Sequence, residues 1–316
     1  MELLEITSEE YGRFTGDKIP VFCRRDFLEL NKNKVDMVRY FLGCDKKKRL
    51  AFAVGEKDDK WLAPYSSPFS TIIDLRTNTP VEYFWEFVKL LNYEAREEGK
   101  KYITIFLPPN IYGEENNSKI INALIGNGYK MEYEELNYAL DIKDIKIDEY
   151  KQTLQCNAKR NLKIALSSNL SIIKCTDLED KKAAYEVIRI NHEYRKHPLR
   201  MTLGQVLETI NILRHDIFIV KKEGASLASA IVFWITDRIV QIIYWGNVPN
   251  AEEYKPMNFL AYELIKYYKA QGIDYIDIGI STENGIPNYG LCNFKESIGC
   301  EAASKYRYSI CLTEDL

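Results

Sequence analysis

Three features that often reveal what a protein does are scarce in this sequence of 316 residues. Its 43 lysines and arginines nearly balance 46 aspartates and glutamates, and a net charge of −3 excludes a globally basic DNA-binding protein. There are only three histidines, and no two of the seven cysteines have the C-x-x-C spacing. We therefore expect reduced thiols, no metal site and no DNA partner.

Signals for targeting are also missing. The first residues, Met1–Glu5, have neither the basic start nor the apolar run of a signal peptide. The most apolar stretch, 228–246, carries Asp237 and Arg238 in its middle, which favours two strands and a turn over a membrane span. The sequence thus predicts a cytoplasmic protein without a transmembrane segment.

Four common enzyme motifs are absent as well, namely the Walker A loop, G-x-G-x-x-G, H-E-x-x-H and G-x-S-x-G. Their absence argues against kinases, Rossmann dehydrogenases, zincins and α/β-hydrolases. What the chain has is 46% hydrophobic and 28% charged residues, the composition of a folded globule, and a length that suits about two domains. Tyrosine is abundant, with 22 residues against 13 phenylalanines, which suits polar-lined clefts as well as ordinary strands.

An internal repeat supports the estimate of two domains. Gly99–Ile105 and Gly272–Ile278 share the pattern G-x-x-Y-I-x-I at an offset of 173 residues, and an isoleucine–glycine pair follows each copy at the same offset. Around each copy, apolar spacing predicts a helix, a strand, a second helix and a closing strand. We therefore predict two tandem α+β domains, 1–147 and 148–316, each a mixed sheet flanked by helices.

The segment just after the join is unusually basic. Between residues 151 and 200 there are eleven lysines and arginines but five acidic residues, a local charge of +6 against −9 elsewhere. Lys159, Arg160 and Lys163 share the polar face of a predicted helix. An anionic partner would be favoured here, and a solvated helix face is the alternative.

Four local motifs, read together with the order of elements, indicate a family. They are Pro64–Pro68, Leu107–Pro109, the basic stretch Lys159–Ala165, and Asn293–Lys295 with Gly299. A strand pair, a helix, a strand and a short helix form an order that resembles the GCN5-related N-acyltransferase (GNAT) fold. Two such units in tandem resemble the Fem-type peptidoglycan aminoacyltransferases and their BioF2-like relatives.

The resemblance implies acyl transfer to an amine, in which the amine attacks an activated carbonyl, either a thioester or an aminoacyl ester. In this fold the acyl carbonyl lies where two parallel strands splay apart and leave backbone N–H groups free to stabilise an oxyanion. Here we expect the splay between Ile239–Trp245 and Tyr275–Gly279. Gly246 and Gly279, at the ends of these strands, permit a close approach of the backbone, although an ordinary turn would also explain them.

The identity of the acyl donor depends on one loop. GNAT enzymes cradle the pyrophosphate of coenzyme A with a glycine-containing loop at a helix N-terminus. The corresponding stretch, Asn250–Pro256, has no glycine, carries two glutamates and ends in a proline without an N–H. No cofactor is firmly implied, and aminoacyl-tRNA is favoured over acetyl-CoA as donor. The resemblance suggests an anionic small molecule or a nucleotide-sugar peptide as acceptor, such as a peptidoglycan precursor, with tRNA as a further partner.

Candidate site residues follow from the resemblance. Where many GNAT enzymes have a tyrosine four residues before the last helix's glycine, this chain has Lys295, and Fem-like proteins resemble it in their Phe-Lys pair. We predict that Lys295 stabilises the oxyanion or binds a substrate phosphate, with a surface lysine as the alternative. Glu283, in the polar loop 281–290, is the candidate general base. The substrate-binding candidates are Asn288, Tyr289, Phe294, Tyr244, Trp245, Arg160, Lys163, Arg195, Arg200, Tyr65 and Ser66.

Arg195 and Arg200 are further expected to complete a phosphate clamp with Arg160. Two other functions stay open. One is an acetyl-CoA-dependent N-acetyltransferase of a small amine, which the missing glycine loop disfavours. The other is a non-catalytic binding module of the same fold, which Lys295, the basic helix and the polar loop together disfavour.

Overall fold

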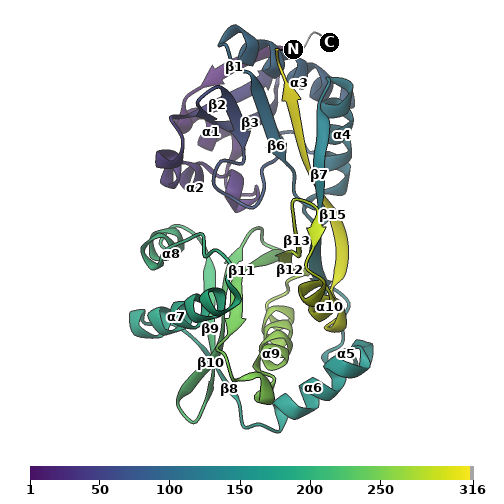
Figure 1. Cartoon of the computed structure of the whole chain (residues 1–316). Helices are drawn as coiled ribbons and strands as arrows, with labels where there is room; N and C mark the ends of the chain where they lie inside the picture. The colour runs from purple at the N-terminus through teal and green to yellow at the C-terminus, as the bar shows by residue number, and fades with distance from the viewer. Residues whose placement is uncertain (314–316) are drawn as a thin grey trace. The chain divides into compact units, whose positions relative to one another are not determined.

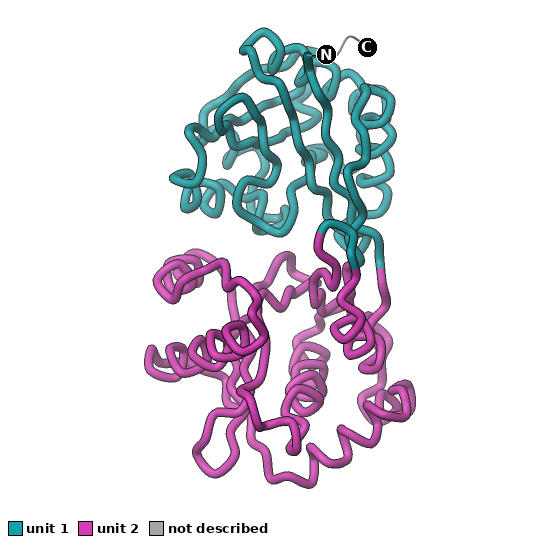
Figure 2. Tube along the Cα trace, viewed as in Figure 1, with its two compact units in different colours: residues 1–136, 284–286, 303–316 teal, residues 137–283, 287–302 magenta. Residues whose placement is uncertain are grey.

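In a computed structural model of the chain, residues 1–313 are described and form two compact units (Figure 2). Unit 1 contains Met1–Leu136, Asn284–Ile286 and residues 303–313. Unit 2 contains Asn137–Glu283 and Pro287–Ala302. Among the described residues, no helix combines the length and apolarity needed to cross a membrane, and no cluster of three or more metal-ligating side chains occurs.

Unit 1 is a largely antiparallel sheet with helices packed on it (Figure 1). The strand order is β1-β2-β3-β4-β6-β15-β7, with β5 beside β3. Its strands are β1 Glu2–Ile6, β2 Met37–Cys44, β3 Lys48–Lys57, β4 Lys60–Ala63, β5 Ile73–Asp74, β6 Tyr102–Phe106, most of β15 Glu301–Cys311 and the first part of β7 Lys130–Asp141. Its helices are α1 Ser8–Thr15, α2 Arg25–Leu30, α3 Val81–Glu97 and α4 Glu114–Gly126, with short 3-10 turns at Val21–Cys23, Lys32–Lys34 and Asn110–Tyr112.

The helix α3 shows why these elements form. Phe84, Val88, Leu91 and Ala95 recur at helical spacing, and all four are buried in the core of unit 1. Pro80 precedes the first turn, and the chain leaves the helix just before Gly99, whose φ of 71° is readily adopted only by glycine. The apolar stripe therefore fixes both the helix and the face that packs on the sheet.

The sheet of unit 1 is completed by the last strand of the chain. β15 pairs with β6 antiparallel, from Arg307 opposite Phe106 to Cys311 opposite Tyr102. Tyr308 and Ile310 of β15 are buried in the same core as α3. About 200 residues of sequence thus separate β15 from β6, the strand with which it pairs.

Unit 2 has the strand order β7-β12-β11-β10-β9-β8. The strands are the second part of β7, β8 Ser171–Lys174, β9 His215–Lys222, β10 Ala225–Trp234, β11 Ile239–Asn247 and β12 Tyr275–Ile280, and the short hairpin strands β13 Thr282–Glu283 and β14 Ile286–Pro287 follow β12. The helices are α5 Ile147–Thr153, α6 Cys156–Leu166, α7 Leu178–Arg195, α8 Leu203–Ile210, α9 Pro256–Ala270 and α10 Tyr289–Ser297, with a 3-10 turn at Glu252–Tyr254.

Helices cover both faces of the unit 2 sheet (Figure 1). On one face, Ser229 of β10 donates its hydroxyl to the carbonyl of Ala184 in α7 at 2.6 Å. On the other face, Phe218 of β9 packs edge-on against Tyr268 of α9. Phe218 is paired with Ala230, the strand neighbour of Ser229, and successive residues of a strand point to opposite faces. α7 and α9 therefore lie on opposite sides of this sheet.

The compact units differ from a division at residues 147 and 148. The contacts place the boundary within β7, at 136 and 137, and assign the last strand to unit 1. Hydrophobic periodicity shows that 301–311 is a strand but carries no information about which strand it pairs with. The sequence repeat and the compact units therefore have different boundaries.

Candidate functional site

The most distinctive backbone feature of unit 2 is a pair of parallel strands that part. β11 and β12 are paired at only three positions, the last of which is Gln241 opposite Asp277. Both strands continue beyond that point, β11 to Asn247 and β12 to Ile280. Backbone N–H groups of β11 that face β12 after Gln241 thus have no ladder partner in β12. The splay was expected between these two strands, and it begins at Gln241 and Asp277.

Irregular pairing on either side accompanies the splay. In the β10–β11 ladder the register shifts between Ile231 and Val232, so that Ile243 is an extra residue in β11. In the β12–β7 ladder the register shifts between Asp277 and Gly279, which leaves Ile278 as the extra residue. Gly279 has a φ of 72°, which favours glycine there. Both bulges re-aim backbone groups at the point where the strands separate.

Lys295 of α10 holds the free end of β12. Its ammonium donates to the carbonyls of Ile278, Gly279 and Ile280 at 3.0, 2.9 and 3.0 Å. The side chain is 1% exposed, and burial lowers the pKa of Lys295 to about 8. A lysine ammonium has three protons, and all three are used here. Lys295 is therefore not a surface lysine, and in this geometry its ammonium holds the end of β12 and has no proton left for an oxyanion or a phosphate.

A fully buried carboxylate lies at the apex of the splay. Asp277 accepts hydrogen bonds from the amides of Asn137 and Gln241, at 2.8 and 2.9 Å, and from the backbone N–H of Gly279 at 2.8 Å. Asn137 belongs to β7, so three adjacent strands contribute to this network. Sequence analysis did not select these residues. The available signal was an aspartate between isoleucines in the strand Tyr275–Ile280, where a buried charge needs partners.

The aromatic candidates Tyr244 and Trp245 are neighbours near the end of β11, and they make different contacts. Trp245 packs edge-on against Phe294 of α10, with ring centroids 5.7 Å apart. The hydroxyl of Tyr244 accepts a hydrogen bond from the backbone N–H of Met201, and the ring of Tyr244 meets the ring of His192 at 5.6 Å. Burial raises the pKa of Tyr244, so its hydroxyl stays protonated at neutral pH.

The polar loop after β12 is a short hairpin rather than an open loop. Asn284 and Gly285 form its turn with positive φ, and their backbone N–H groups donate to the buried carboxylate of Glu135 at 2.9 and 3.3 Å. Glu283 is exposed in β13. These contacts fix the hairpin backbone and leave Glu283 in solvent.

The two substrate candidates at the start of α10 differ in their surroundings. Asn288 caps the helix, because its side chain accepts the N–H of Leu291 at 3.1 Å. Tyr289 is 74% exposed and free to meet a ligand. The capping hydrogen bond thus gives Asn288 a structural role. No such contact explains the exposed tyrosine at position 289.

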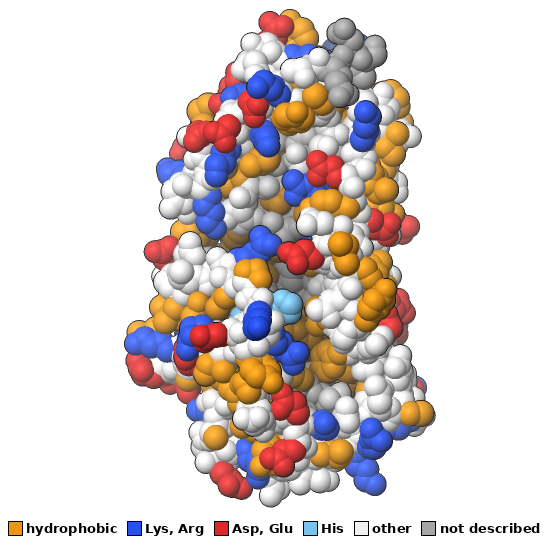
Figure 3. Space-filling view, in the orientation of Figure 1, with side chains coloured by type: hydrophobic (Ala, Val, Ile, Leu, Met, Phe, Trp, Pro, Cys, Tyr) orange, Lys and Arg blue, Asp and Glu red, His pale blue; other side chains and the backbone are white. Residues whose placement is uncertain are grey.

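The basic candidates do not form a single clamp. Arg160 and Lys163 are exposed on α6, which packs against α9, whereas Arg195 and Arg200 flank the segment between α7 and α8. Because α7 and α9 cover opposite faces of the sheet, Arg160 is not brought to Arg195 and Arg200. The predicted clamp is therefore wrong as a three-residue group. Figure 3 shows lysines and arginines interspersed with acidic residues over the visible face.

Tyr65 and Ser66 lie in unit 1, in the segment that follows β4. The Tyr65 hydroxyl donates to the carbonyl of Leu28 at 2.6 Å, and the Ser66 hydroxyl donates to Asn31. Lys34, which sequence analysis did not select, donates to the Ser66 hydroxyl, and burial lowers the pKa of its ammonium. A small recess of about 10 Å³ lies beside these residues. They form a polar cluster of their own, within unit 1.

The two copies of the repeat differ at the positions that matter for the splay. At the offset of 173 residues, Thr104 stands where unit 2 has Asp277, and Phe106 stands where it has Gly279. Asn122 occupies the place of Lys295 and accepts a hydrogen bond from Trp85 on the surface. The buried carboxylate and the buried ammonium are therefore features of the second copy.

No family model and no curated protein matches the chain significantly. Among solved structures, FemX is similar over 98% of this chain and 97% of its own length, with a TM-score of 0.72 and 15% identity. L-PGS from Bacillus licheniformis is similar over 98% of this chain and 92% of its own, with a TM-score of 0.62 and 12% identity.

A third similar structure is a tandem GNAT protein. The tandem GNAT protein from the clavulanic acid biosynthesis pathway is similar over 100% of this chain and 99% of its own, with a TM-score of 0.56 and 9% identity. At such identities the likeness establishes the fold and leaves the activity open. The expected fold is confirmed, and the chain has a tandem GNAT fold of the kind seen in FemX.

Proposed function

We propose that this protein is an acyltransferase that moves an aminoacyl or acyl group to an amine acceptor, with its chemistry in unit 2. The observation that carries the proposal is the splay of β11 and β12 after Gln241 and Asp277. Free backbone N–H groups at such a splay are preorganised donors for the oxyanion that forms when an amine attacks a carbonyl. Removing one donor of this kind typically costs about 3–4 kcal/mol of transition-state stabilisation.

The buried groups around the splay support a catalytic use. Lys295 fixes three consecutive carbonyls of β12, so the strand end cannot drift toward β11. Holding donors in place before the reaction is what makes them effective, because no reorganisation is then needed. A binding module without catalysis would have no need of a buried ammonium and a buried carboxylate at this point, since burying charges costs free energy.

The type of acyl donor that we propose follows from the segment before α9. It contains the turn Glu252–Tyr254, and α9 starts at Pro256, which has no N–H to offer an anion. Glu252 and Glu253 are both exposed there and would repel a pyrophosphate. The segment therefore favours an aminoacyl ester, as carried by tRNA, over acetyl-CoA, and an anionic cell-wall precursor is the acceptor that we propose.

The proposal can be tested by transfer assays with defined donors. The purified protein would be incubated with alanyl-tRNA or acetyl-CoA and with a UDP-linked muropeptide or a polyamine, and products would be read by mass spectrometry. We expect alanyl transfer to the muropeptide and none from acetyl-CoA. Acetylation of the polyamine would instead establish the N-acetyltransferase alternative. No product and no thermal shift with any of the four would contradict the enzyme proposal.

A further inference from the structure

The network at the apex of the splay leaves two strong acceptors unused. Asn137 and Gln241 each donate an amide N–H to Asp277, and their carbonyl oxygens, Oδ1 and Oε1, are buried without a hydrogen-bond partner among the described residues. The residues themselves are 1% and 3% exposed. A buried polar atom without a partner is costly, and such atoms are rare in folded proteins unless something else satisfies them.

The surrounding charge makes these oxygens better acceptors than ordinary amides. Each amide already donates to the carboxylate of Asp277, and a donated hydrogen bond shifts electron density toward the amide oxygen. Both oxygens therefore belong to units polarised by the same negative charge. A ligand that suits them must supply N–H or O–H donors, and a positively charged donor forms the stronger hydrogen bond.

The position of the two acceptors along the strands indicates which part of a ligand would lie next to them. Gln241 is the last paired residue of β11, and the extra residue Ile243 and the unpaired N–H groups follow it directly. An acyl carbonyl held by those N–H groups would have its α-carbon and α-substituent within two bonds of the reacting carbon. The α-substituent would thus lie next to the splay apex, where the two acceptors are.

The ammonium of Lys295 does not satisfy these acceptors. Its three protons go to the carbonyls of Ile278, Gly279 and Ile280, on the α10 side of β12. The side chains of Gln241 and Asp277, being directly paired, share one face of the sheet. Lys295 therefore leaves both acceptors without a donor among the described residues.

We propose that Gln241 and Asn137, held by Asp277, form a subsite for the α-ammonium of the transferred acyl group and so select aminoacyl over simple acyl donors. This inference rests on the proposed acyl transfer and assigns its donor specificity to named residues. The two amide oxygens accept from the ammonium, and the acyl carbonyl lies toward the free N–H groups of β11. An acetyl or propionyl group would leave both oxygens unpaired, which costs binding free energy.

The test compares ligands that differ only in the ammonium. L-alaninamide, N-acetyl-L-alaninamide and propionamide would be titrated into the full-length protein, and binding would be followed by chemical-shift changes of isotope-labelled side-chain amides. We expect L-alaninamide to bind at least about tenfold more tightly than the other two, because it alone supplies charged donors. The side-chain amide signals of Asn137 and Gln241 should shift with it.

Two variants and a control separate the subsite from general stability. Gln241→Lys keeps a donor to Asp277 but removes the acceptor and adds a like charge, so the preference for L-alaninamide should be lost. Asn137→Leu should weaken the preference for L-alaninamide. Asn92→Leu is the control, because Asn92 is a buried asparagine of unit 1 whose amide and carbonyl are both hydrogen-bonded. It should lower stability without changing the preference.

The outcomes for the subsite and for the enzyme can be told apart. Equal binding of the three amides, or no binding at all, would overturn the subsite whatever the transfer assay shows. Selective binding of L-alaninamide that persists in Gln241→Lys would overturn it too, because the selectivity would then lie elsewhere. Selective binding that depends on Gln241, with no acyl transfer from any donor, would keep the subsite and refute the enzyme.

Discussion

Replacing Lys295 should have the largest effect on stability and on acyl transfer. Replacing it by methionine keeps the length of the side chain but leaves three carbonyls of β12 without a donor. We expect the free energy of unfolding to fall by about 3 kcal/mol, from lost hydrogen bonds to a charged group. Acyl transfer should fall by about 100-fold, because a small displacement of the strand end spoils the alignment of reacting groups.

Urea unfolding and single-turnover transfer would check this prediction. Lys266→Met is a suitable control, because Lys266 is a lysine of α9 that pairs with Glu263 at the surface. That variant should stay within about 0.5 kcal/mol of the wild type. A Lys295→Met protein with full activity would exclude a positioning role in catalysis.

The same lysine gives a pH dependence whose sign can be worked out. Burial lowers the pKa of Lys295 to about 8, whereas an unfolded lysine titrates at about 10.4. Between these values the unfolded chain binds more protons, so the free energy of unfolding contributed by Lys295 rises with pH. Below about pH 8 both states are charged, and the contribution is constant.

The difference between wild type and Lys295→Met isolates this effect from the tyrosines that titrate in the same range. Measured in urea at pH 7, 8, 9 and 10, the stability advantage of the wild type should be flat to about pH 8 and then increase. A difference that is constant across the whole range would show that Lys295 does not titrate there.

At the scale of elements, the hairpin after β12 is held by one carboxylate. Glu135 accepts two backbone N–H groups of the turn, from Asn284 and Gly285. In Glu135→Gln an amide replaces one acceptor oxygen and opposes an N–H with another N–H. We expect a loss of about 1–3 kcal/mol and faster hydrogen exchange at Asn284 and Gly285.

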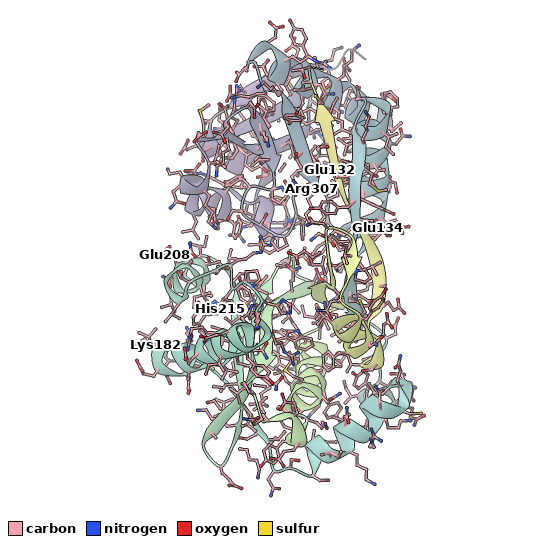
Figure 4. The ribbon with its side chains drawn as sticks, viewed as in Figure 1. Glu132, Glu134, Lys182, Glu208, His215 and Arg307 are labelled. Atoms are coloured by element: carbon pink, nitrogen blue, oxygen red, sulfur yellow. The ribbon has the colours of Figure 1, made fainter. Side chains whose placement is uncertain are left out.

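The neighbouring Glu134 supplies the matched control. It lies on β7 near the ion pair of Glu132 with Arg307 (Figure 4), and it accepts the hydroxyl of Ser304. Glu134→Gln keeps an oxygen for that hydroxyl, so exchange at the hairpin amides should not change. Equal acceleration in both variants would mean that the hairpin responds to the charge of β7 rather than to Glu135.

The elements also show which features can be predicted from the sequence and which cannot. The helix over 81–97 and the strands around the splay were predictable, because apolar spacing and glycine positions depend on neighbours in sequence. The contacts of Lys295 were not predictable, because its partners are backbone carbonyls that carry no residue identity. Gln241 and Asn137 were missed for a related reason. Each is an ordinary polar residue until a distant strand brings Asp277 beside it.

A repeated glycine shows the limit of the internal repeat. Gly126 and Gly299 stand at the same place in the two copies, yet a Cβ at Gly126 would lie 2.0 Å from the ring of Trp85. At Gly299 the nearest atom would be 3.8 Å away, and the backbone φ of 90° is what favours glycine. The repeat predicted that both positions are glycine, but the physical reason differs between the copies.

At the scale of the whole chain, the membership of the last strand, β15, in unit 1 has a consequence for folding. Unit 1 takes the strand that lies between β6 and β7 from the end of the chain, and Tyr308, Ile310 and Leu312 are buried in its core. A fragment of residues 1–147, the first half by sequence, lacks this strand. It would leave the edge of β6 unpaired and expose core residues that β15 normally covers.

We therefore expect the fragment 1–147 to be largely unfolded or aggregated on its own and to fold when a peptide of residues 301–313 is added. Folding would be followed by circular dichroism and by the fluorescence of Trp61, which is buried in the intact unit. A peptide with Tyr308→Asp and Ile310→Asp should fail to rescue, because it places charges in the apolar core. If the fragment instead unfolds cooperatively with native-like stability and no peptide, β15 is dispensable, and the halves of the sequence are themselves the folding units.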